Sequence, residues 1–296
     1  MLHPQSRAAL AEEEGEKPVQ DPTNDIAGQR AEARAAAMAE PREDVAAVRD
    51  LDADGVPVRL YRPVVGADPL PVIVHLHGGG FVFNDVEVHD AVARRFANRS
   101  GMAVLSVDYR RPPEHRFPAA PDDVDTVLAW LDREGAGLGL DLGRQFVHGD
   151  SAGGNLALVA ALRHPGRFAG MVLLYPFIDA QMRHASYDEA VGLWNRDEAA
   201  WYWEQYARSA DDYRDPDFSP YESDRLDTLP PTLVITCEHD PLRDEAEVLA
   251  SRIAEAGVVC VGTRYLGMLH SFWRHPEFDA AEPAMAQVVG FLRMCS

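Results

Sequence analysis

Residues 149–153, Gly-Asp-Ser-Ala-Gly, are the segment of the chain that most clearly indicates its fold. A strand-type segment, residues 145–148, precedes them, and a helix-type segment, residues 152–163, follows. A serine between a strand and a helix sits on a strained turn that needs small neighbours, because other chain segments approach it closely. The pentapeptide therefore predicts a nucleophilic Ser151 with its Oγ exposed. A chance glycine-rich turn is the alternative, and the flanking strand and helix disfavour it.

A second glycine-rich segment, residues 77–80 (His-Gly-Gly-Gly), follows the apolar residues 71–76. Glycines let backbone N–H groups approach a ligand without a Cβ clash, and such donors stabilise the oxyanion of acyl transfer. We expect Gly79, Gly80 and Ala152 to supply them. A phosphate loop is disfavoured because no GK[ST] follows. His77 is expected to brace the loop.

A serine nucleophile needs a base, and five histidines follow Ser151 in the chain. They are His164, His184, His239, His270 and His275. His270 lies between the last predicted strand and the last predicted helix, where the base of a Ser–acid–His order belongs. His270 is therefore the expected base, and His275 is its main rival.

The acid that orients the base is expected at Asp240, which follows the strand-type residues 232–237. Asp240 also precedes Pro241, and an aspartate before a proline commonly caps a helix. The sequence does not separate these two roles. Glu238 and Asp244 are weaker candidates for the acid.

Strand-type and helix-type segments alternate along most of the chain. Apolar strand-type runs cover residues 71–77, 103–107, 145–148, 170–174, 232–237 and 258–265. Helical patterns cover residues 25–39, 88–98, 121–134, 152–163, 242–256 and 280–292. Residues 45–49 and 56–61 suggest a hairpin that turns at Asp54-Gly55. The pattern predicts an α/β fold with a mostly parallel central sheet covered by helices on both faces.

Residues 179–227 break this alternation with an aromatic-rich, charged segment that is too long for a simple loop. We expect residues 1–44 to form N-terminal cap helices and residues 179–227 to form a cap insertion. The catalytic domain would then comprise residues 45–178 and 228–296. Phe81, Trp201 and Tyr202 are expected to contact substrate. The cap aromatics Trp194, Trp201, Tyr202 and Trp203 would then line an acyl or alcohol pocket. The alternative is that these four side chains form the cap's own core.

The composition limits the partners. The 296 residues are 46% hydrophobic and carry a formal net charge of -20, which disfavours phosphate backbones and anionic lipid surfaces. Neither nucleic acid nor a membrane is therefore expected as a partner. The longest apolar runs are about seven residues, against the ~20 that a membrane helix needs. The first twenty residues show no apolar signal-peptide region.

Three cysteines without metal-type spacing, Cys237, Cys260 and Cys295, indicate neither a disulfide framework nor a zinc site. We expect a cytoplasmic protein that uses no metal and no cofactor. Its expected partner is a small-molecule ester, with a homodimer as one option for assembly.

Several further segments, in order and spacing, make the chain resemble the hormone-sensitive-lipase-like carboxylesterases, also called bacterial family IV. Besides residues 77–80 and 149–155, they are Tyr109-Arg110 with Pro113-Glu114-His115, residues 117–120, Tyr175-Pro176, Asp215-Pro216 with Ser219-Pro220, and residues 240–244. The resemblance spans about residue 45 to the C-terminus. It implies an α/β-hydrolase with a helical cap, the triad Ser151, Asp240 and His270, and the oxyanion hole named above.

Two positions depart from the family pattern. Ser271 stands where the family usually has a glycine after the catalytic histidine, and Arg111-Pro112 stands where it usually has Leu-Ala. Neither change removes a catalytic group. The chain is thus expected to hydrolyse short- to medium-chain acyl esters through an acyl-enzyme. An amidase, lactonase or deacetylase would use the same triad, and a non-catalytic binder on the same fold is a remoter alternative.

Overall fold

The computed structural model describes residues 1–13, 15–65, 69–189, 191–192 and 194–295. Its centre is an eight-stranded sheet in the order β1-β2-β4-β3-β5-β6-β7-β8. The strands are β1 (Ala47–Ala53), β2 (Val56–Arg62), β3 (Leu70–Leu76), β4 (Ala103–Val107), β5 (Leu140–Asp150), β6 (Gly170–Leu174), β7 (Thr232–His239) and β8 (Cys260–Leu269).

The sheet is parallel from β4 to β8, and only the β1–β2 and β2–β4 pairs are antiparallel. The carboxyl ends of parallel strands meet at one edge of a sheet, which is where ligands bind in such folds. The segments that follow β3, β5, β7 and β8 therefore converge, although they are far apart in sequence. These four segments begin with His77, Ser151, Asp240 and His270.

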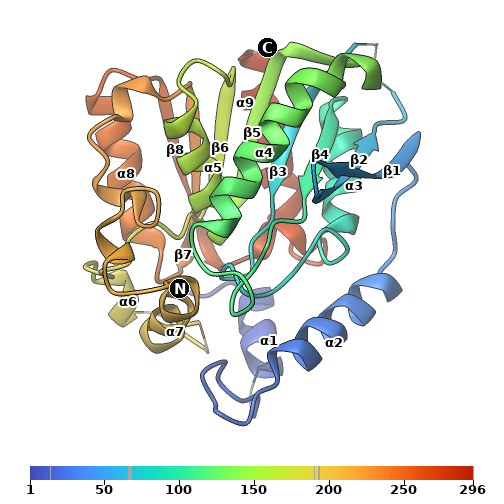
Figure 1. Ribbon diagram of the computed structural model, residues 1–296. Helices are drawn as coiled ribbons and strands as arrows, with labels where there is room; N and C mark the ends of the chain where they lie inside the picture. Colours follow the sequence, from blue (N-terminus) through green and yellow to red (C-terminus); the bar gives the residue numbers. More distant parts are fainter. Residues whose placement is uncertain (14, 66–68, 190, 193, 296) are drawn as a thin grey trace.

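Helices cover both faces of the sheet, as Figure 1 shows. One face packs against α3 (Asp90–Ser100) and α9 (Ala281–Met294), and the other against α4 (Ala119–Glu134), α5 (Ala152–Arg163) and α8 (Arg243–Glu255). Every residue of β4 and β6 is buried, because a parallel strand covered on both faces meets no solvent. The predicted fold class is confirmed.

Four further helices gather at the lower end of the molecule in Figure 1. They are α1 (Pro4–Glu12), α2 (Ile26–Ala39), α6 (Ser186–Glu189) and α7 (Arg196–Tyr206). Short 3₁₀ turns complete the chain: η1 (Gly135–Leu138), η2 (Asp212–Arg214), η3 (Pro220–Glu222), η4 (Leu226–Thr228) and η5 (Phe272–Arg274). The division into a catalytic domain and two cap segments remains a prediction.

Two elements differ from the sequence-based expectation. Helix α1 lies outside the one helical pattern, residues 25–39, that was expected near the N-terminus. Contacts with a distant segment fix its position, since His3 N–H and Ser6 Oγ both donate to the Gly267 carbonyl, at 3.1 and 2.7 Å. Strand β8 was expected to end at residue 265 but continues to Leu269. It does so because pairing with β7 resumes after an irregularity, with His239 opposite Leu269. His270 therefore follows its strand directly.

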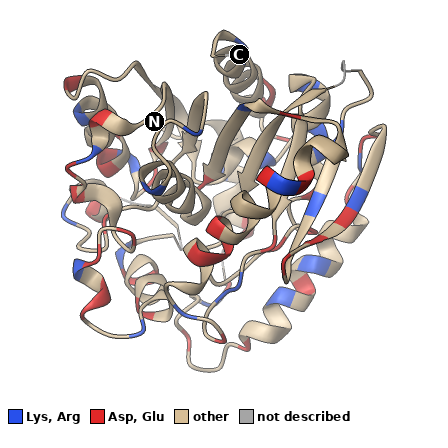
Figure 2. Ribbon diagram, turned by 45° about the horizontal axis from the view of Figure 1, so that its top comes forward, with Lys and Arg blue, Asp and Glu red and all other residues tan. Residues whose placement is uncertain are grey.

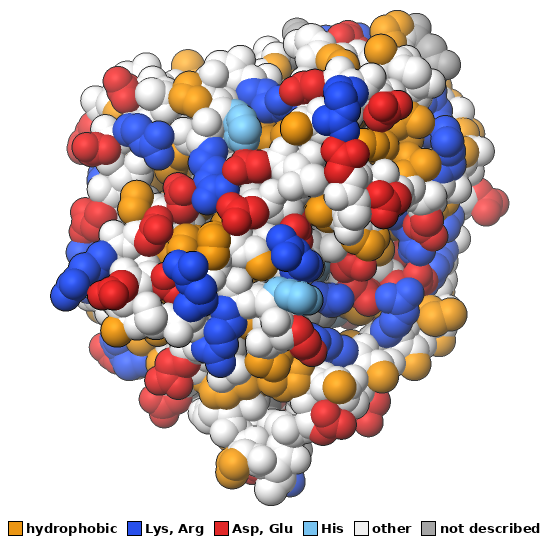
Figure 3. Space-filling view, viewed as in Figure 1, with side chains coloured by type: hydrophobic (Ala, Val, Ile, Leu, Met, Phe, Trp, Pro, Cys, Tyr) orange, Lys and Arg blue, Asp and Glu red, His pale blue; other side chains and the backbone are white. Residues whose placement is uncertain are grey.

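Charged residues are distributed over the outer elements (Figure 2), and on the face shown in Figure 3 arginines lie among acidic side chains. Opposite charges form ion pairs on the surface: Arg163, for example, lies 2.7 Å from Asp125 and 2.9 Å from Asp217. Among the described residues, no helix has the length and apolar character needed to span a bilayer.

Candidate active site

Ser151 occupies the turn between β5 and α5 with φ 55° and ψ −122°, a backbone conformation that side-chain-bearing residues rarely adopt. The tight turn requires glycine at the positions on either side of Asp150-Ser151-Ala152. A Cβ on Gly149 would lie 2.0 Å from the Gly153 carbonyl oxygen, and one on Gly153 would lie 2.0 Å from the Leu76 carbonyl oxygen. Strain of this kind persists only where the surroundings enforce it, and here it holds the serine between strand and helix.

The three predicted catalytic side chains form one chain of hydrogen bonds. His270 Nε2 lies 3.0 Å from Ser151 Oγ, and His270 Nδ1 lies 2.8 Å from Asp240 Oδ2. Asp240 is 1% exposed, and its carboxylate can hold the Nδ1–H tautomer, which leaves Nε2 free to accept the serine proton.

Asp240 makes the contacts that both roles suggested by its sequence position would require. Its Oδ2 meets His270, while its Oδ1 accepts the Leu242 N–H at 3.0 Å, at the start of α8. The same Oδ1 also accepts the indole N–H of Trp194 at 3.2 Å. A carboxylate with two oxygens has enough acceptor sites for all three donors.

The other four histidines are engaged elsewhere. His275, the rival base, lies 3.2 Å from Glu277, and burial lowers its pKa to about 3. The remaining contacts are His164 with Asp125 at 2.7 Å, His239 with Glu238 at 3.7 Å, and His184 with the Tyr221 ring at 5.2 Å. Only His270 of the five is hydrogen-bonded to Ser151.

The glycine loop after β3 lies beside the serine. Gly79 has φ 122° and Gly80 has φ 58°, values that glycine adopts readily. Close contacts also require glycine here, since a Cβ on Gly79 would lie 2.4 Å from the Phe83 carbonyl oxygen and one on Gly80 would lie 2.1 Å from the Tyr202 ring. Both glycines line the cavity that contains Ser151, and Ala152 is the first residue of α5.

Two side chains hold the preceding residue, Gly78, from opposite sides. Its N–H donates to Asp150 Oδ1 at 3.1 Å, and its carbonyl accepts the Asn84 side-chain amide at 3.1 Å. Burial raises the pKa of Asp150 to about 6. The residue before the nucleophile therefore fixes the loop that we expect to bind the oxyanion.

His77 has the bracing position expected from the sequence. Its ring stacks on Tyr109 at 4.3 Å, and Tyr109 Oη donates to the His77 carbonyl at 2.7 Å. Burial lowers the pKa of His77 to about 3, so the ring is neutral near pH 7. A neutral ring suits this interior position, because an isolated buried charge is costly.

Further histidines lie beneath the loop. His75 lies 2.9 Å from His148 and 3.3 Å from His89, nitrogen to nitrogen. Within the described ranges, His75, His89 and Asp150 are the one set whose ligand atoms could surround a metal ion. The hydrogen bond between His75 and His89, at 3.3 Å, accounts for the distance between these two rings without an ion.

The cavity at Ser151 has a volume of about 200 Å³. Of the three residues expected to contact substrate, Tyr202 lines it. Phe81 is fully buried and stacks on Tyr206 at 3.8 Å. Trp201 lies against Phe83 and Tyr202 instead, at 6.3 and 5.1 Å.

Trp194, one of the cap aromatics that the sequence suggested as pocket lining, also lines the cavity. Two lining residues were not singled out from the sequence: Asn84 and Glu198. The spacing of Glu198 and Tyr202, four residues apart on α7, could have indicated one face of a helix. Glu198 also joins the cap segments, because it accepts the Val19 N–H at 2.9 Å. Asn84 carried no such signal.

Comparisons with known proteins identify the family and the fold of the chain. The model of a family described as having the alpha/beta hydrolase fold matches residues 73–274. A carboxylic ester hydrolase, LipN, of Mycobacterium tuberculosis is 38% identical over 84% of this chain and 70% of its own length. An ethyl acetate hydrolase of Pseudomonas putida is 33% identical over 82% of this chain and 79% of its own. The solved Pyrobaculum calidifontis esterase has a TM-score of 0.89 at 36% identity, with 99% of both chains covered.

Proposed function

We propose a mechanism and a substrate class for this chain on the premise that it belongs to the hormone-sensitive-lipase-like family of α/β-hydrolases and is a carboxylesterase. The observation that carries the mechanism is the continuous link from Ser151 Oγ through His270 to Asp240, at 3.0 and 2.8 Å. Serine attack with histidine as base is the reaction that this arrangement performs.

In the first half-reaction His270 Nε2 takes the Ser151 proton while Oγ attacks the ester carbonyl. The tetrahedral intermediate collapses to an acyl-enzyme as His270 returns the proton to the leaving alcohol. Water, deprotonated by His270, then attacks the acyl-enzyme; the acyl–Oγ bond breaks, His270 returns the proton to Ser151 Oγ, and the acid leaves. Asp240 stabilises the imidazolium that forms in both halves.

The backbone N–H groups of Gly79, Gly80 and Ala152 are proposed to bind the oxyanion. Two supports fix the loop before substrate arrives: the Gly78–Asp150 hydrogen bond and the Tyr202 ring above Gly80. Donors fixed in advance need no reorganisation during the reaction, and losing one typically costs about 10²–10³ in kcat.

The cavities favour short- to medium-chain acyl esters. A second cavity of about 290 Å³ shares Trp194, His270 and Ser271 with the catalytic cavity, so the two flank the base. Leu10 and Leu269 give the second cavity apolar walls. We assign the acyl part of the ester to one cavity and the alcohol part to the other.

Free thiols at Cys237, Cys260 and Cys295 support a reducing, cytoplasmic setting.

Substitution of the nucleophile tests the mechanism. Ser151→Ala is expected to lower kcat for p-nitrophenyl acetate and butyrate by at least about 10⁴-fold, as removal of a triad member does. Ser251→Ala, an exposed helical serine on α8, is the matched control and should keep the parent rate. Parent-level hydrolysis by the Ser151→Ala protein would contradict the assignment. Faster hydrolysis of long-chain triglycerides than of butyrate or hexanoate esters would contradict the substrate class.

A further inference from the structure

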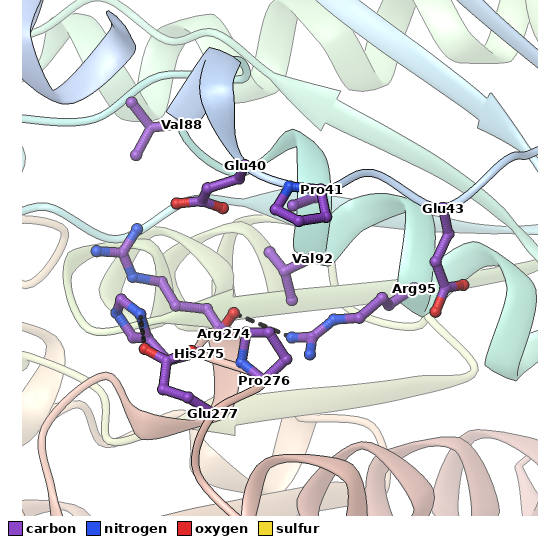
Figure 4. Close-up of a pocket in the computed structure, with 11 residues that line it drawn as sticks. Glu40, Pro41, Glu43, Val88, Val92, Arg95, Arg274, His275, Pro276 and Glu277 are labelled. Atoms are coloured by element: carbon purple, nitrogen blue, oxygen red, sulfur yellow. Dashed lines mark hydrogen bonds and ion pairs between the residues drawn. The ribbon is translucent and has the colours of Figure 1, made fainter. Parts of the chain in front are cut away.

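A separate cavity of about 280 Å³ lies between the segment after α2, helix α3 and the residues that follow η5. Figure 4 shows Glu40 and Pro41 facing the Arg274–Glu277 segment, with Arg95 reaching in from α3. No residue that lines this cavity lines the catalytic one. It is therefore a distinct site, with a volume at the small end of the range for ligand pockets.

Arg95 is a buried cation with an unused donor group. The residue is 7% exposed, and its Nη2 donates to the carbonyls of Trp273 and Arg274 at 3.2 and 3.0 Å. Its Nη1 is buried without a hydrogen-bond partner. The nearest carboxylate, that of Glu282, is 3.8 Å away and is bound at 3.2 Å by Arg99.

The buried Arg95 Nη1 group destabilises the folded protein while it has no acceptor, and a bound ligand can remove this cost. Burial lowers the pKa of Arg95, which shows that the surroundings disfavour its charge. A buried donor without a partner costs about 1–3 kcal/mol. An acceptor placed in the cavity would satisfy Nη1 and offset that cost.

Arg274 supplies a second cation to the same cavity. Within the described part of the chain, no hydrogen bond or ion pair involves its guanidinium, whereas the neighbouring Glu277 carboxylate is 3.2 Å from His275. Burial raises the pKa of Asp150, and the charge of Arg274 partly offsets that rise; burial lowers the pKa of His89, and the charge of Arg274 lowers it further. The cavity is thus electrostatically connected to the floor of the catalytic site.

The rest of the lining indicates the class of ligand. Val88, Val92 and Pro276 provide an apolar wall, which suits a short hydrocarbon tail. Glu40 and Glu43 also line the cavity, and their charges oppose a dianion such as phosphate more strongly than a monoanion. Guanidinium groups match the planar geometry of a carboxylate.

We propose that this cavity binds a small monocarboxylate with a short apolar tail, its head on Arg95 and Arg274 and its tail along Val88 and Val92. The acid that an esterase releases belongs to this chemical class. His275 lines both this cavity and the apolar one beside His270, so a bound acid lies one side chain from the proposed substrate region.

The test is calorimetric titration of sodium hexanoate into the Ser151→Ala protein, which measures binding without relying on ester hydrolysis. Saturable binding is expected. Arg274→Gln should weaken it at least tenfold, and Arg95→Gln should do the same. Arg274 is only partly buried, so its variant decides the outcome if Arg95→Gln does not fold. Arg214→Gln, a control at an exposed arginine, should bind as the parent does.

Two further titrations test the chemistry of the site. Glu40→Gln removes a competing carboxylate and should tighten hexanoate binding several-fold. Inorganic phosphate should bind more weakly than hexanoate. Hexanoate affinity unchanged by Arg274→Gln, or phosphate binding as tight as that of hexanoate, would overturn the proposal. Because the titrated protein lacks the nucleophile, neither result bears on the proposed esterase mechanism.

Discussion

At the scale of single residues, Asp240 shows how one side chain joins the catalytic chemistry to the surrounding structure. Its Oδ2 faces the base, and its Oδ1 is shared by Leu242 N–H and Trp194 Nε1. The Trp194 ring also lies 5.1 Å from the His270 ring. Trp194 therefore contacts two members of the proposed triad, and we expect it to position them.

Trp194→Phe tests this positioning role. The change removes the indole N–H and keeps an aromatic ring. Loss of one hydrogen bond to a charged group costs about 1.5–3 kcal/mol at most, so kcat should fall by roughly ten- to a hundredfold. Trp130→Phe on α4 is the matched control, since Trp130 lines no cavity described at the site. Equal kcat values for the two variants would remove Trp194 from the mechanism.

Ser271, one of the departures from the family pattern, has φ 68° and ψ 4°. A side-chain-bearing residue in this left-handed region costs about 1–2 kcal/mol, and glycine avoids that cost with some loss to unfolded-state entropy. Ser271→Gly should therefore raise the free energy of unfolding in urea by about 0.5–1 kcal/mol. Ser251→Gly, in the middle of α8, should lower it by about 1 kcal/mol. A destabilised Ser271→Gly protein would contradict the strain argument.

At the scale of elements, α2 is fastened to the glycine-loop region by two arginines. Arg30 Nε donates to the Val82 carbonyl at 2.8 Å, its Nη1 binds Glu114 at 2.9 Å, and its Nη2 donates to the Pro112 carbonyl at 2.5 Å. Arg34 Nη1 donates to Asp85 Oδ2 at 2.5 Å. Arg111, the other departure from the family pattern, donates to the Asn84 carbonyl in the same region. Helix α2 thus reaches this region through Arg30 and Arg34.

Arg30→Ala should loosen this attachment without unfolding the sheet. We expect faster proteolytic cleavage within residues 13–45, and a KM for p-nitrophenyl butyrate that rises several-fold while the unfolding midpoint of the remaining protein changes little. Limited proteolysis followed by mass spectrometry locates the cleavage. Arg214→Ala is the control, because Arg214 is exposed and pairs with the equally exposed Asp211 at 3.9 Å. Parent-like cleavage and KM in Arg30→Ala would refute the role of this contact.

At the scale of the whole molecule, the buried histidines dominate the expected response to acid. Burial lowers the pKa values of His75 and His77 to about 3, and places those of His89 and His148 well below 6.5. Between about pH 3 and 6.5 the unfolded chain therefore binds more protons at these positions than the folded protein does. Their contribution to stability is present above pH 6.5 and is lost as the pH falls.

Asp150 acts in the opposite direction. Its pKa is raised to about 6 from 3.8, so between these values the folded protein holds a proton that the unfolded chain has released. This carboxyl makes the protein less stable as the pH rises through that window. The carboxyls of Asp108, Glu198 and Glu245, whose pKa values burial also raises, act in the same direction as Asp150. The four buried histidines act against them, and we expect the net stability to fall on acidification.

Unfolding free energies from urea titrations at pH 7.5, 6 and 5 measure this slope. Each histidine contributes up to about 1.4 kcal/mol per pH unit. His75→Phe should reduce the slope below pH 6.5 by up to that amount, whereas exposed His115→Gln should leave it unchanged. Stability that stays constant between pH 7.5 and 5 would show that the buried histidines are not neutral in the folded protein.

Most of the architecture could be predicted from local pattern. The expected segments 152–163 and 170–174 coincide with α5 and β6, and the expected nucleophile, acid and base lie within hydrogen-bond reach of one another. The residues of a buried strand or an amphipathic helix show by their own apolar pattern that the element is buried. The glycines of the GDSAG segment likewise indicate a tight, strained turn. Helix α1 escaped prediction because its main anchor, Gly267, lies at the other end of the chain.

The chemistry was thus encoded locally, since a strained serine turn, a glycine loop and the order of acid and base can each be recognised from neighbouring residues. The folded arrangement selected His270 among five histidines. It also decided the Trp194 contact with Asp240 and the meeting of Arg95 and Arg274 in the cavity beside α3. These features join residues from segments far apart in sequence. Their distances are set by how the strands and cap helices pack, and no local pattern contains that information.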